Sequence, residues 1–227
     1  MIIKNNKFLL SKGLAFYTEK ESLRLEEELR DGWHLKKVSY FGYYVLEQGV
    51  REDKRVVIDV YSGKKHDIQE YYDLYQESGW EVIARHQRYQ IFKGEREAPF
   101  VYTDEATYKD RFRYERRWLF YRYLPTALVS LIVLWLLNQQ GIRLFFQEHS
   151  VVYDSLQLVL LIGLLVPLIM ASLLMYFQLV YPRRSQYYQK PEGYGKRQRF
   201  GIDMVASMVI GGILGVIIAT VMSYLVI

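Results

Sequence analysis

Few side chains in this sequence have the type and spacing that catalysis needs. His66 and Glu70 stand one helical turn apart, which could place a general base beside a carboxylate. Together with Asp67 they also form an ordinary helix N-terminus, where acidic side chains complement the helix dipole. The four histidines are too scattered to predict a metal site, and the absence of cysteine excludes thiolate ligands, disulfides and a cysteine nucleophile. We therefore expect no catalytic residue, no cofactor and no metal, and we expect that the protein is not an enzyme.

Asp59 is harder to dismiss, because it lies inside the apolar strand predicted over residues 54–61. A carboxylate buried there without a partner would be costly. Alternation places it on the same face as Val57 and opposite Val56 and Ile58. We expect Asp59 to face solvent and to pair with a lysine or arginine across the sheet, and contact with a ligand is the alternative.

Tyrosine is frequent, with 21 in 227 residues, and several tyrosines lie in predicted strands. Tyrosine suits a half-covered sheet face without any special role, and it also supplies rigid contact area to a partner. An antiparallel sheet covered by helices on one side leaves its other face available. We therefore predict that the face bearing Tyr43 or Tyr44 binds a protein or peptide partner.

The elements that position these residues form an internal repeat. A helix predicted over residues 19–30 ends at Gly32, and Trp33 opens an extended segment that turns near Gly42. After the strand containing Asp59, a second helix ends at Gly79, and Trp80 opens another extended segment. The two Gly-Trp pairs stand 47 residues apart.

With a first strand near residues 14–17, the repeat predicts an α+β domain over residues 1–105 that is ferredoxin-like, with one sheet covered by two helices. Trp33 and Trp80 should be core anchors at the helix–sheet junctions, and a paired aromatic clamp for a ligand is the alternative. Residues 106–117 are expected to form a basic juxtamembrane helix or linker.

This order of elements resembles the DUF2812 family, a bacterial domain of unknown function. The matching residues, within about 10–95, are Gly32-Trp33, Tyr43-Tyr44, Val56 to Tyr61, Tyr71-Tyr72 and Gly79-Trp80. The resemblance implies C-terminal membrane spans, which family members commonly carry, and some members are encoded beside PadR-type transcriptional regulators. It implies no catalytic residues.

Residues 118–227 have the composition of a membrane domain. Three charge-poor windows reach the roughly 20 residues that a span requires, at about 118–138, 155–181 and 202–226. Six basic residues lie at 109–122, one at 138–154 and six at 183–200. Because basic flanks stay cytoplasmic, we predict a multi-pass protein of the cell membrane, an all-α three-span bundle with its N terminus cytoplasmic and its C terminus external.

The basic flanks do not predict nucleic-acid binding. Both adjoin predicted spans, where topology and anionic headgroups account for them, and residues 1–105 carry 17 basic and 19 acidic side chains. Gly193 and Gly195 lack the preceding strand that a phosphate-binding loop requires. We expect the lipid bilayer as a partner and no nucleic acid.

The third predicted span carries a row of small residues at every fourth position: Ser207, Gly211, Gly215, Ala219 and Ser223. Such a row lets helix backbones approach closely in lipid. We expect it to pack against the second span near Gly163 and Ala171, and a homo-oligomer is the alternative.

Three functions remain possible from the sequence. The first is a membrane-anchored cytoplasmic module that binds a protein or peptide in signalling or regulation. The alternative is an immunity or stress-tolerance protein that acts against toxic peptides or with a transporter. An enzyme is the least favoured, because no nucleophile–base pair or metal cluster is visible.

Overall fold

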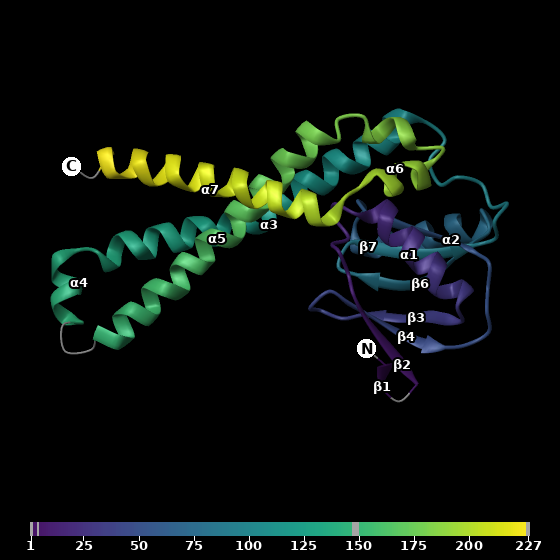
Figure 1. The fold of residues 1–227 in the computed structure, drawn as a ribbon, viewed down its shortest axis with the longest axis horizontal. Helices are drawn as coiled ribbons and strands as arrows, with labels where there is room; N and C mark the ends of the chain where they lie inside the picture. The colour runs from purple at the N-terminus through teal and green to yellow at the C-terminus, as the bar shows by residue number, and fades with distance from the viewer. Residues whose placement is uncertain (1, 4, 147–149, 226–227) are drawn as a thin grey trace. The chain divides into compact units, whose positions relative to one another are not determined.

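The computed structural model describes residues 2–3, 5–146 and 150–225, and the chain divides into two compact units (Figure 1). The first, which we call the α+β unit, comprises Met1–Glu115 and Arg183–Phe200. The second, which we call the helical unit, comprises Arg116–Pro182 and Gly201–Ile227. The α+β unit is therefore assembled from two segments separated in sequence.

The α+β unit contains two antiparallel sheets, with strand orders β1-β2-β4-β3 and β5-β7-β6. Their strands are β1 (Ile2–Ile3), β2 (Asn6–Leu10), β3 (Trp33–Val38), β4 (Tyr43–Gln48), β5 (Arg55–Val60), β6 (Trp80–His86) and β7 (Tyr89–Gly94). Its helices are α1 (Thr18–Arg30), η1 (Lys65–Asp67), α2 (Ile68–Glu77), η3 (Arg184–Tyr187) and α6 (Pro191–Arg197), together with the start of α3 (Glu105–Leu137).

The predicted repeat is present in the fold. The elements β2–α1–β3–β4 and β5–α2–β6–β7 follow the same order, and in both the third strand lies between the first and second. Gly32 and Gly79 end their helices with φ of +83° and +82°, a conformation that favours glycine. The register also shifts at equivalent points, between Leu35 and Lys37 and between Val82 and Ala84.

Two details of the predicted fold are wrong. The first strand is β2 at Asn6–Leu10 rather than residues 14–17, which turn into α1 and bury Leu14 and Tyr17. The strands also form two sheets instead of one, because the three strands of each repeat pair with one another and not with those of the other repeat. Only the two-residue β1 adds to the first sheet.

The two helices of the repeat contact different faces of β5. Val57 packs with Tyr75 and Phe92 on the side of α2. Alternation then directs Val56 and Ile58 to the opposite face, where β5 contacts α1. Both faces of this strand are therefore covered, which explains why all but one of its residues are buried.

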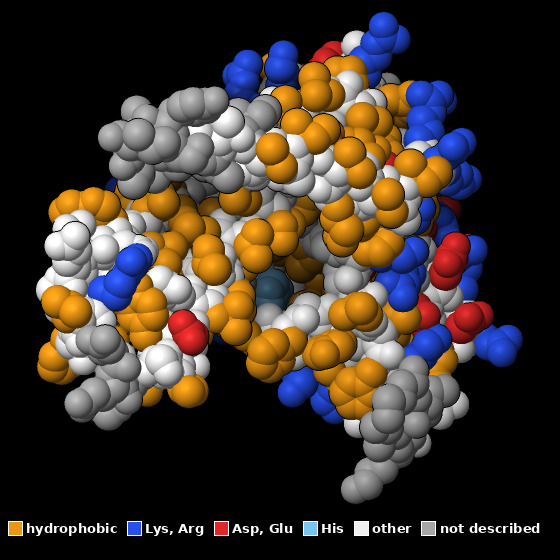
Figure 2. All heavy atoms as spheres, turned by 60° about the vertical axis from the view of Figure 1, so that its left-hand side comes forward, with side chains coloured by type: hydrophobic (Ala, Val, Ile, Leu, Met, Phe, Trp, Pro, Cys, Tyr) orange, Lys and Arg blue, Asp and Glu red, His pale blue; other side chains and the backbone are white. Residues whose placement is uncertain are grey.

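The helical unit comprises the rest of α3, α4 (Gln140–Phe145), α5 (Ser150–Val180) and α7 (Phe200–Leu225). Two of its helices, α3 and α5, are long and apolar enough to cross a membrane. Within the described residues of α7 the apolar segment is the shorter Phe200–Ile213. Many of their large hydrophobic side chains are exposed, and Figure 2 shows such side chains on the face turned to the viewer.

Candidate functional site

Asp59 is the centre of a buried polar cluster in the α+β unit. Its side chain is on the face of Val57, as alternation predicts, but the expectation that this face meets solvent is wrong, because α2 covers it. The residue is 4% exposed. Its Oδ2 accepts hydrogen bonds from the hydroxyls of Tyr71 at 2.7 Å and Tyr75 at 2.6 Å, and its Oδ1 accepts one from Tyr102.

The cation that pairs with Asp59 comes from α3 rather than from a neighbouring strand. Arg111 Nε lies 3.0 Å from Asp59 Oδ1, and Arg111 Nη2 donates to the backbone oxygen of Ile58 at 3.0 Å. Burial raises the pKa of Tyr71, Tyr75 and Tyr102, and the nearby carboxylate raises each further. The three hydroxyls therefore stay protonated and serve as donors to the side chain of Asp59.

A second buried ion pair joins α1 to the segment after α5. Arg184 donates to both carboxylate oxygens of Glu19 at 2.7 Å, and also to Thr18 Oγ1 at 2.7 Å. The hydroxyl of Tyr108 donates to Glu19 Oε1 at 2.9 Å. Burial alone would raise the pKa of Glu19, but the charge and hydrogen bonds of Arg184 overcome this and hold the pKa below its ordinary value.

Other contacts hold the segment Arg183–Phe200 on the start of α1. The side chain of Gln198 donates to the backbone oxygen of Phe16 at 2.8 Å, and the rings of Tyr17 and Phe200 meet edge to face at 5.3 Å. A Cβ on Gly195 would lie 2.9 Å from the carbonyl carbon of Glu19. This glycine thus serves close backbone packing.

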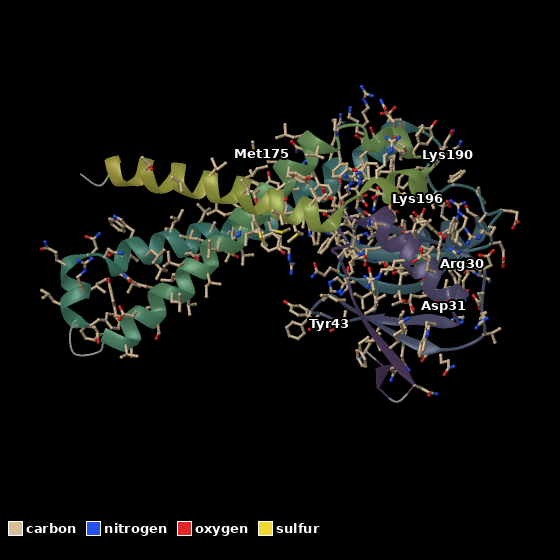
Figure 3. All side chains as sticks on the ribbon, in the orientation of Figure 1. Arg30, Asp31, Tyr43, Met175, Lys190 and Lys196 are labelled. Carbon is tan, nitrogen blue, oxygen red and sulfur yellow. The ribbon has the colours of Figure 1, made fainter. Side chains whose placement is uncertain are left out.

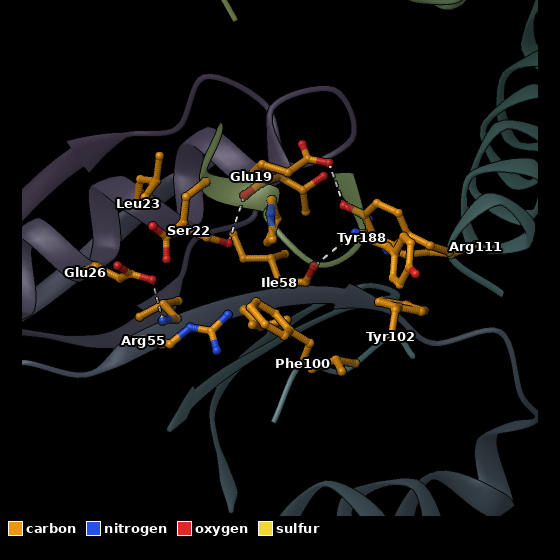
Figure 4. A pocket seen from close by; sticks show the side chains of 17 residues that line it. Glu19, Ser22, Leu23, Glu26, Arg55, Ile58, Phe100, Tyr102, Arg111 and Tyr188 are labelled. Atoms are coloured by element: carbon orange, nitrogen blue, oxygen red, sulfur yellow. Dashed lines mark hydrogen bonds between the residues drawn. The ribbon is translucent and has the colours of Figure 1, made fainter. Parts of the chain in front are cut away.

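A pocket of about 50 Å³ opens beside the two buried ion pairs (Figure 4). Its labelled lining residues are Glu19, Ser22, Leu23, Glu26, Arg55, Ile58, Phe100, Tyr102, Arg111 and Tyr188. Ligand pockets for drug-sized molecules and cofactors measure about 300–1,000 Å³, so this cavity has room for water-sized occupants only. Burial raises the pKa of Glu26, whose Oε1 accepts from the backbone N–H of Val56 at 3.0 Å.

The two tryptophans that were predicted as core anchors differ in burial. Trp80 is 2% exposed, packs with Tyr75 and Phe92, and donates through Nε1 to the backbone oxygen of Pro99 at 3.1 Å. Trp33 is only half-buried, with Lys7 Nζ 5.5 Å from its ring centre, so its prediction as a core anchor is wrong. The linker contributes to the burial of Trp80, because Ala98 and Val101 pack against its aromatic cluster.

The two predicted contact tyrosines lie on opposite faces of β4. Tyr44 is fully buried and donates to Ser11 Oγ at 3.3 Å, so it is not available to a partner. Tyr43 is 43% exposed at the start of β4, next to the hairpin turn (Figure 3). Its neighbours form an exposed apolar patch, which we call the Tyr43 surface: Phe8, Leu10, Tyr40, Phe41 and Tyr43.

The described residues contain no group of three or more side chains of the metal-binding types. His66 and Asp67 lie 3.0 Å apart, and the side chains of both are exposed. These positions therefore fit the ordinary helix start that the sequence allowed.

Part of the row of small residues on α7 packs against other residues of the same chain. Ser207 is buried, and a Cβ on Gly211 would lie 3.2 Å from Ser172 Oγ of α5. Around Gly215 nothing lies within 4 Å of such a Cβ among the described residues. The side chains of Ala219 and Ser223 lie outside the described part of the chain. The homo-oligomer stays a prediction.

A buried carboxylate also joins α7 to α5 in the helical unit. Asp203 Oδ1 accepts from the hydroxyl of Tyr176 at 2.7 Å, and both its oxygens accept from Tyr181 at 2.9 and 3.0 Å. This carboxylate is 1% exposed. Its hydroxyl donors compensate the cost of burying it.

Sequence reasoning missed Glu19, Arg111 and Arg184 as members of the buried cluster. The two arginines belong to basic runs that the predicted topology already accounted for, so their charge gave no separate signal. Asp59 was the available sign of the cluster, because an acidic residue in an apolar strand needs a partner.

Comparison with family models gives a match over residues 17–123 to the family described as "Protein of unknown function (DUF2812)". Comparisons with curated proteins and with solved structures give no match. The matched range includes both Gly-Trp pairs as well as Asp59 and Arg111, and it precedes the segment that carries Arg184. The resemblance of this chain to the DUF2812 family is confirmed over these residues.

Proposed function

We propose that this chain is a non-enzymatic integral membrane protein whose α+β unit lies in the cytoplasm and binds a protein or peptide partner in signalling or regulation. The observation that carries the proposal is the Tyr43 surface. It is an exposed aromatic patch on a folded unit, in a chain with two helices able to cross a membrane.

The proposed topology has the α+β unit inside, three crossings by α3, α5 and α7, and the C terminus outside. The basic counts of six, one and six support it. A second support is that Met1–Glu115 and Arg183–Phe200 belong to one compact unit. The proposed topology agrees with this, because it puts both segments on the same side of the bilayer with two crossings between them.

Reporter fusions test this topology. Alkaline phosphatase fused after Gly141 or after Ile227 should be active, because both points are placed outside, whereas a fusion at Gly193 should be silent. The reversed pattern would reject the orientation. If the fusion after Gly141 is active but the fusion after Ile227 is inactive, the result rejects only the third crossing, by α7, and keeps the first two.

The Tyr43 surface suits a protein or peptide for physical reasons. Tyr40 and Phe41 are 77% and 78% exposed, and their rings meet edge to face. Leu10 lies opposite Tyr43 in the β2–β4 register, so both side chains point from the same face. A groove of about 380 Å³ runs beside them. Contiguous exposed apolar patches mark interaction sites, and tyrosine is enriched among residues that dominate binding energy.

Substituting Tyr40 and Tyr43 by Ser should reduce partner capture at least tenfold while the melting temperature stays close to that of the wild type. The measurement is crosslinking and quantitative co-purification from detergent-solubilised membranes. Leu74, which is 61% exposed on α2, provides the control: Leu74→Ser removes an exposed apolar side chain from another surface and should leave capture unchanged.

Capture that survives the double substitution would place the partner surface elsewhere. The same variant separates the immunity or stress-tolerance alternative, in which the spans carry the function. Under that alternative, tolerance of toxic peptides should persist when the Tyr43 surface is lost.

A further inference from the structure

The buried cluster of the α+β unit holds more acidic than basic groups. Three carboxyl residues, Glu19, Asp59 and Glu115, are each 4% exposed or less. Two guanidinium groups compensate them, those of Arg111 and Arg184, whose side chains are 4% and 12% exposed. With every group ionised, the cluster carries one excess negative charge in a region of low dielectric constant, where an uncompensated charge is costly.

The two guanidinium groups share one neighbourhood. The Arg111 and Arg184 groups lie 5.0 Å and 4.1 Å from the ring centre of Phe112. Glu115 follows Arg111 by one turn of α3 and feels the charges of both arginines. The groups around Glu115 therefore come from α1, β5, β7, α3 and η3: Glu19, Asp59, Tyr89, Arg111 and Arg184.

Hydrogen bonding distinguishes the three carboxyl groups. Asp59 accepts from three tyrosine hydroxyls and pairs with Arg111. Glu19 accepts two bonds from Arg184 and one from Tyr108. Glu115, by contrast, has the hydroxyl of Tyr89 beside it, and its Oε1 has no hydrogen-bond partner in the described part of the chain. Glu115 is the least compensated carboxylate, so it is the group on which a proton removes the excess charge at lowest cost.

We propose that Glu115 is a proton-binding site through which the α+β unit responds to weakly acidic conditions. The site lies where α3 leaves the α+β unit, three residues before Trp118, at which the first predicted span begins. Proton binding there changes the charge at the base of a helix that continues into the helical unit.

The electrostatics agree with the geometry. Burial raises the pKa of Glu115 to about 6, although the charges of Arg111 and Arg184 and the hydroxyl of Tyr89 oppose the rise. The ordinary pKa is 4.5, so the folded state binds the proton more tightly than the unfolded chain. The stability that the folded state gains from protonated Glu115 is complete below pH 4.5 and is lost as the pH rises through about 6. Glu19, whose pKa is lowered, acts in the opposite direction at lower pH.

Thermal unfolding of the full chain in detergent, measured from pH 5 to pH 8, tests the site. The melting temperature of Glu115→Gln minus that of the wild type should grow by roughly 3–5 °C over this range, with a midpoint near pH 6. Glu26 also has a raised pKa, but it is present in both proteins and cancels in the difference. Glu115→Asp, which keeps a carboxyl group, should retain the wild-type pH dependence.

Asp110→Asn is the matched control on the same helix, because Asp110 is exposed and pairs only with Arg113 at the surface in the described part of the chain. The melting temperature of Asp110→Asn minus that of the wild type should not change between pH 5 and pH 8. A direct readout uses carboxyl-¹³C glutamate labelling: the resonance missing in Glu115→Gln should titrate near pH 6 in the wild type. A constant melting difference for Glu115→Gln, or a resonance that titrates near 4.5, overturns the proposal.

Discussion

Replacing Asp59 by Asn should destabilise the α+β unit by about 3–5 kcal/mol, the usual cost of removing one partner of a buried ion pair. The substitution keeps the volume of the side chain but removes the carboxylate that pairs with Arg111 and accepts hydrogen bonds from three tyrosine hydroxyls. Because domains of this size are stable by only about 5–15 kcal/mol, the loss should be visible as a large shift in the denaturant midpoint of the full chain in detergent.

Asp53→Asn is the matched control, because Asp53 pairs with Arg96 at 2.6 Å on the surface, where its side chain is 65% exposed. Surface pairs contribute little, so this variant should unfold close to the wild type. Combining Asp59→Asn with Arg111→Met should cost less than the sum of the two single changes, since the double variant removes both members of the ion pair together. Strict additivity, or a mild Asp59→Asn, would contradict the buried pair.

Trp80→Ala should cost about 3–5 kcal/mol, whereas Trp33→Ala should cost clearly less, although the two tryptophans occupy equivalent positions in the repeat. Trp80 is buried in its aromatic cluster and donates a hydrogen bond to Pro99. Truncation there leaves a cavity and an unpaired carbonyl. Trp33 is half-exposed, so its neighbours and water can fill the space.

Denaturant unfolding of the two variants beside the wild type measures this difference. Equal losses would show that Trp33 is as deeply packed as Trp80. If instead either variant unfolds like the wild type but fails to capture the partner, the paired aromatic clamp is the better interpretation of these residues.

The parts of the fold that depend on local sequence could be predicted. Each helix end followed by Gly-Trp and a strand is set by a few adjacent residues. Gly32 and Gly79 supply the left-handed conformation that ends the helix, and apolar alternation marks the strands that follow. The long helix α3 was also predictable as a basic stretch that continues into an apolar one.

The pairing of distant segments could not be predicted. Whether two βαββ units share one sheet or form two depends on packing between strands far apart in sequence, which local pattern does not specify. The same applies to the cluster: Arg111 pairs with Asp59 at a separation of 52 residues, and Arg184 reaches Glu19 across 165. Nothing within either basic run distinguishes a buried arginine from one that contacts headgroups.

At the Tyr43 surface, the feature that could not be predicted is which of two adjacent tyrosines is exposed. Tyr43 and Tyr44 have the same side chain, and strand geometry requires that they point to opposite faces. The sequence could therefore predict that one of them is exposed, but only the position of α1 and the register of β2 on β4 decide which.

The discontinuous α+β unit has a consequence for biogenesis. Arg184 and Gln198 complete the contacts of α1, yet the ribosome makes them only after the 67 residues of Arg116–Pro182. At roughly 5–20 residues per second, this delay lasts about 3–13 s. In the proposed topology, the unit can finish folding only once α3 and α5 have been inserted and the chain has returned to the cytoplasm. A chain in which only one of α3 and α5 crosses the membrane would leave Glu19 without Arg184, and quality-control proteases would recognise it by that incomplete domain.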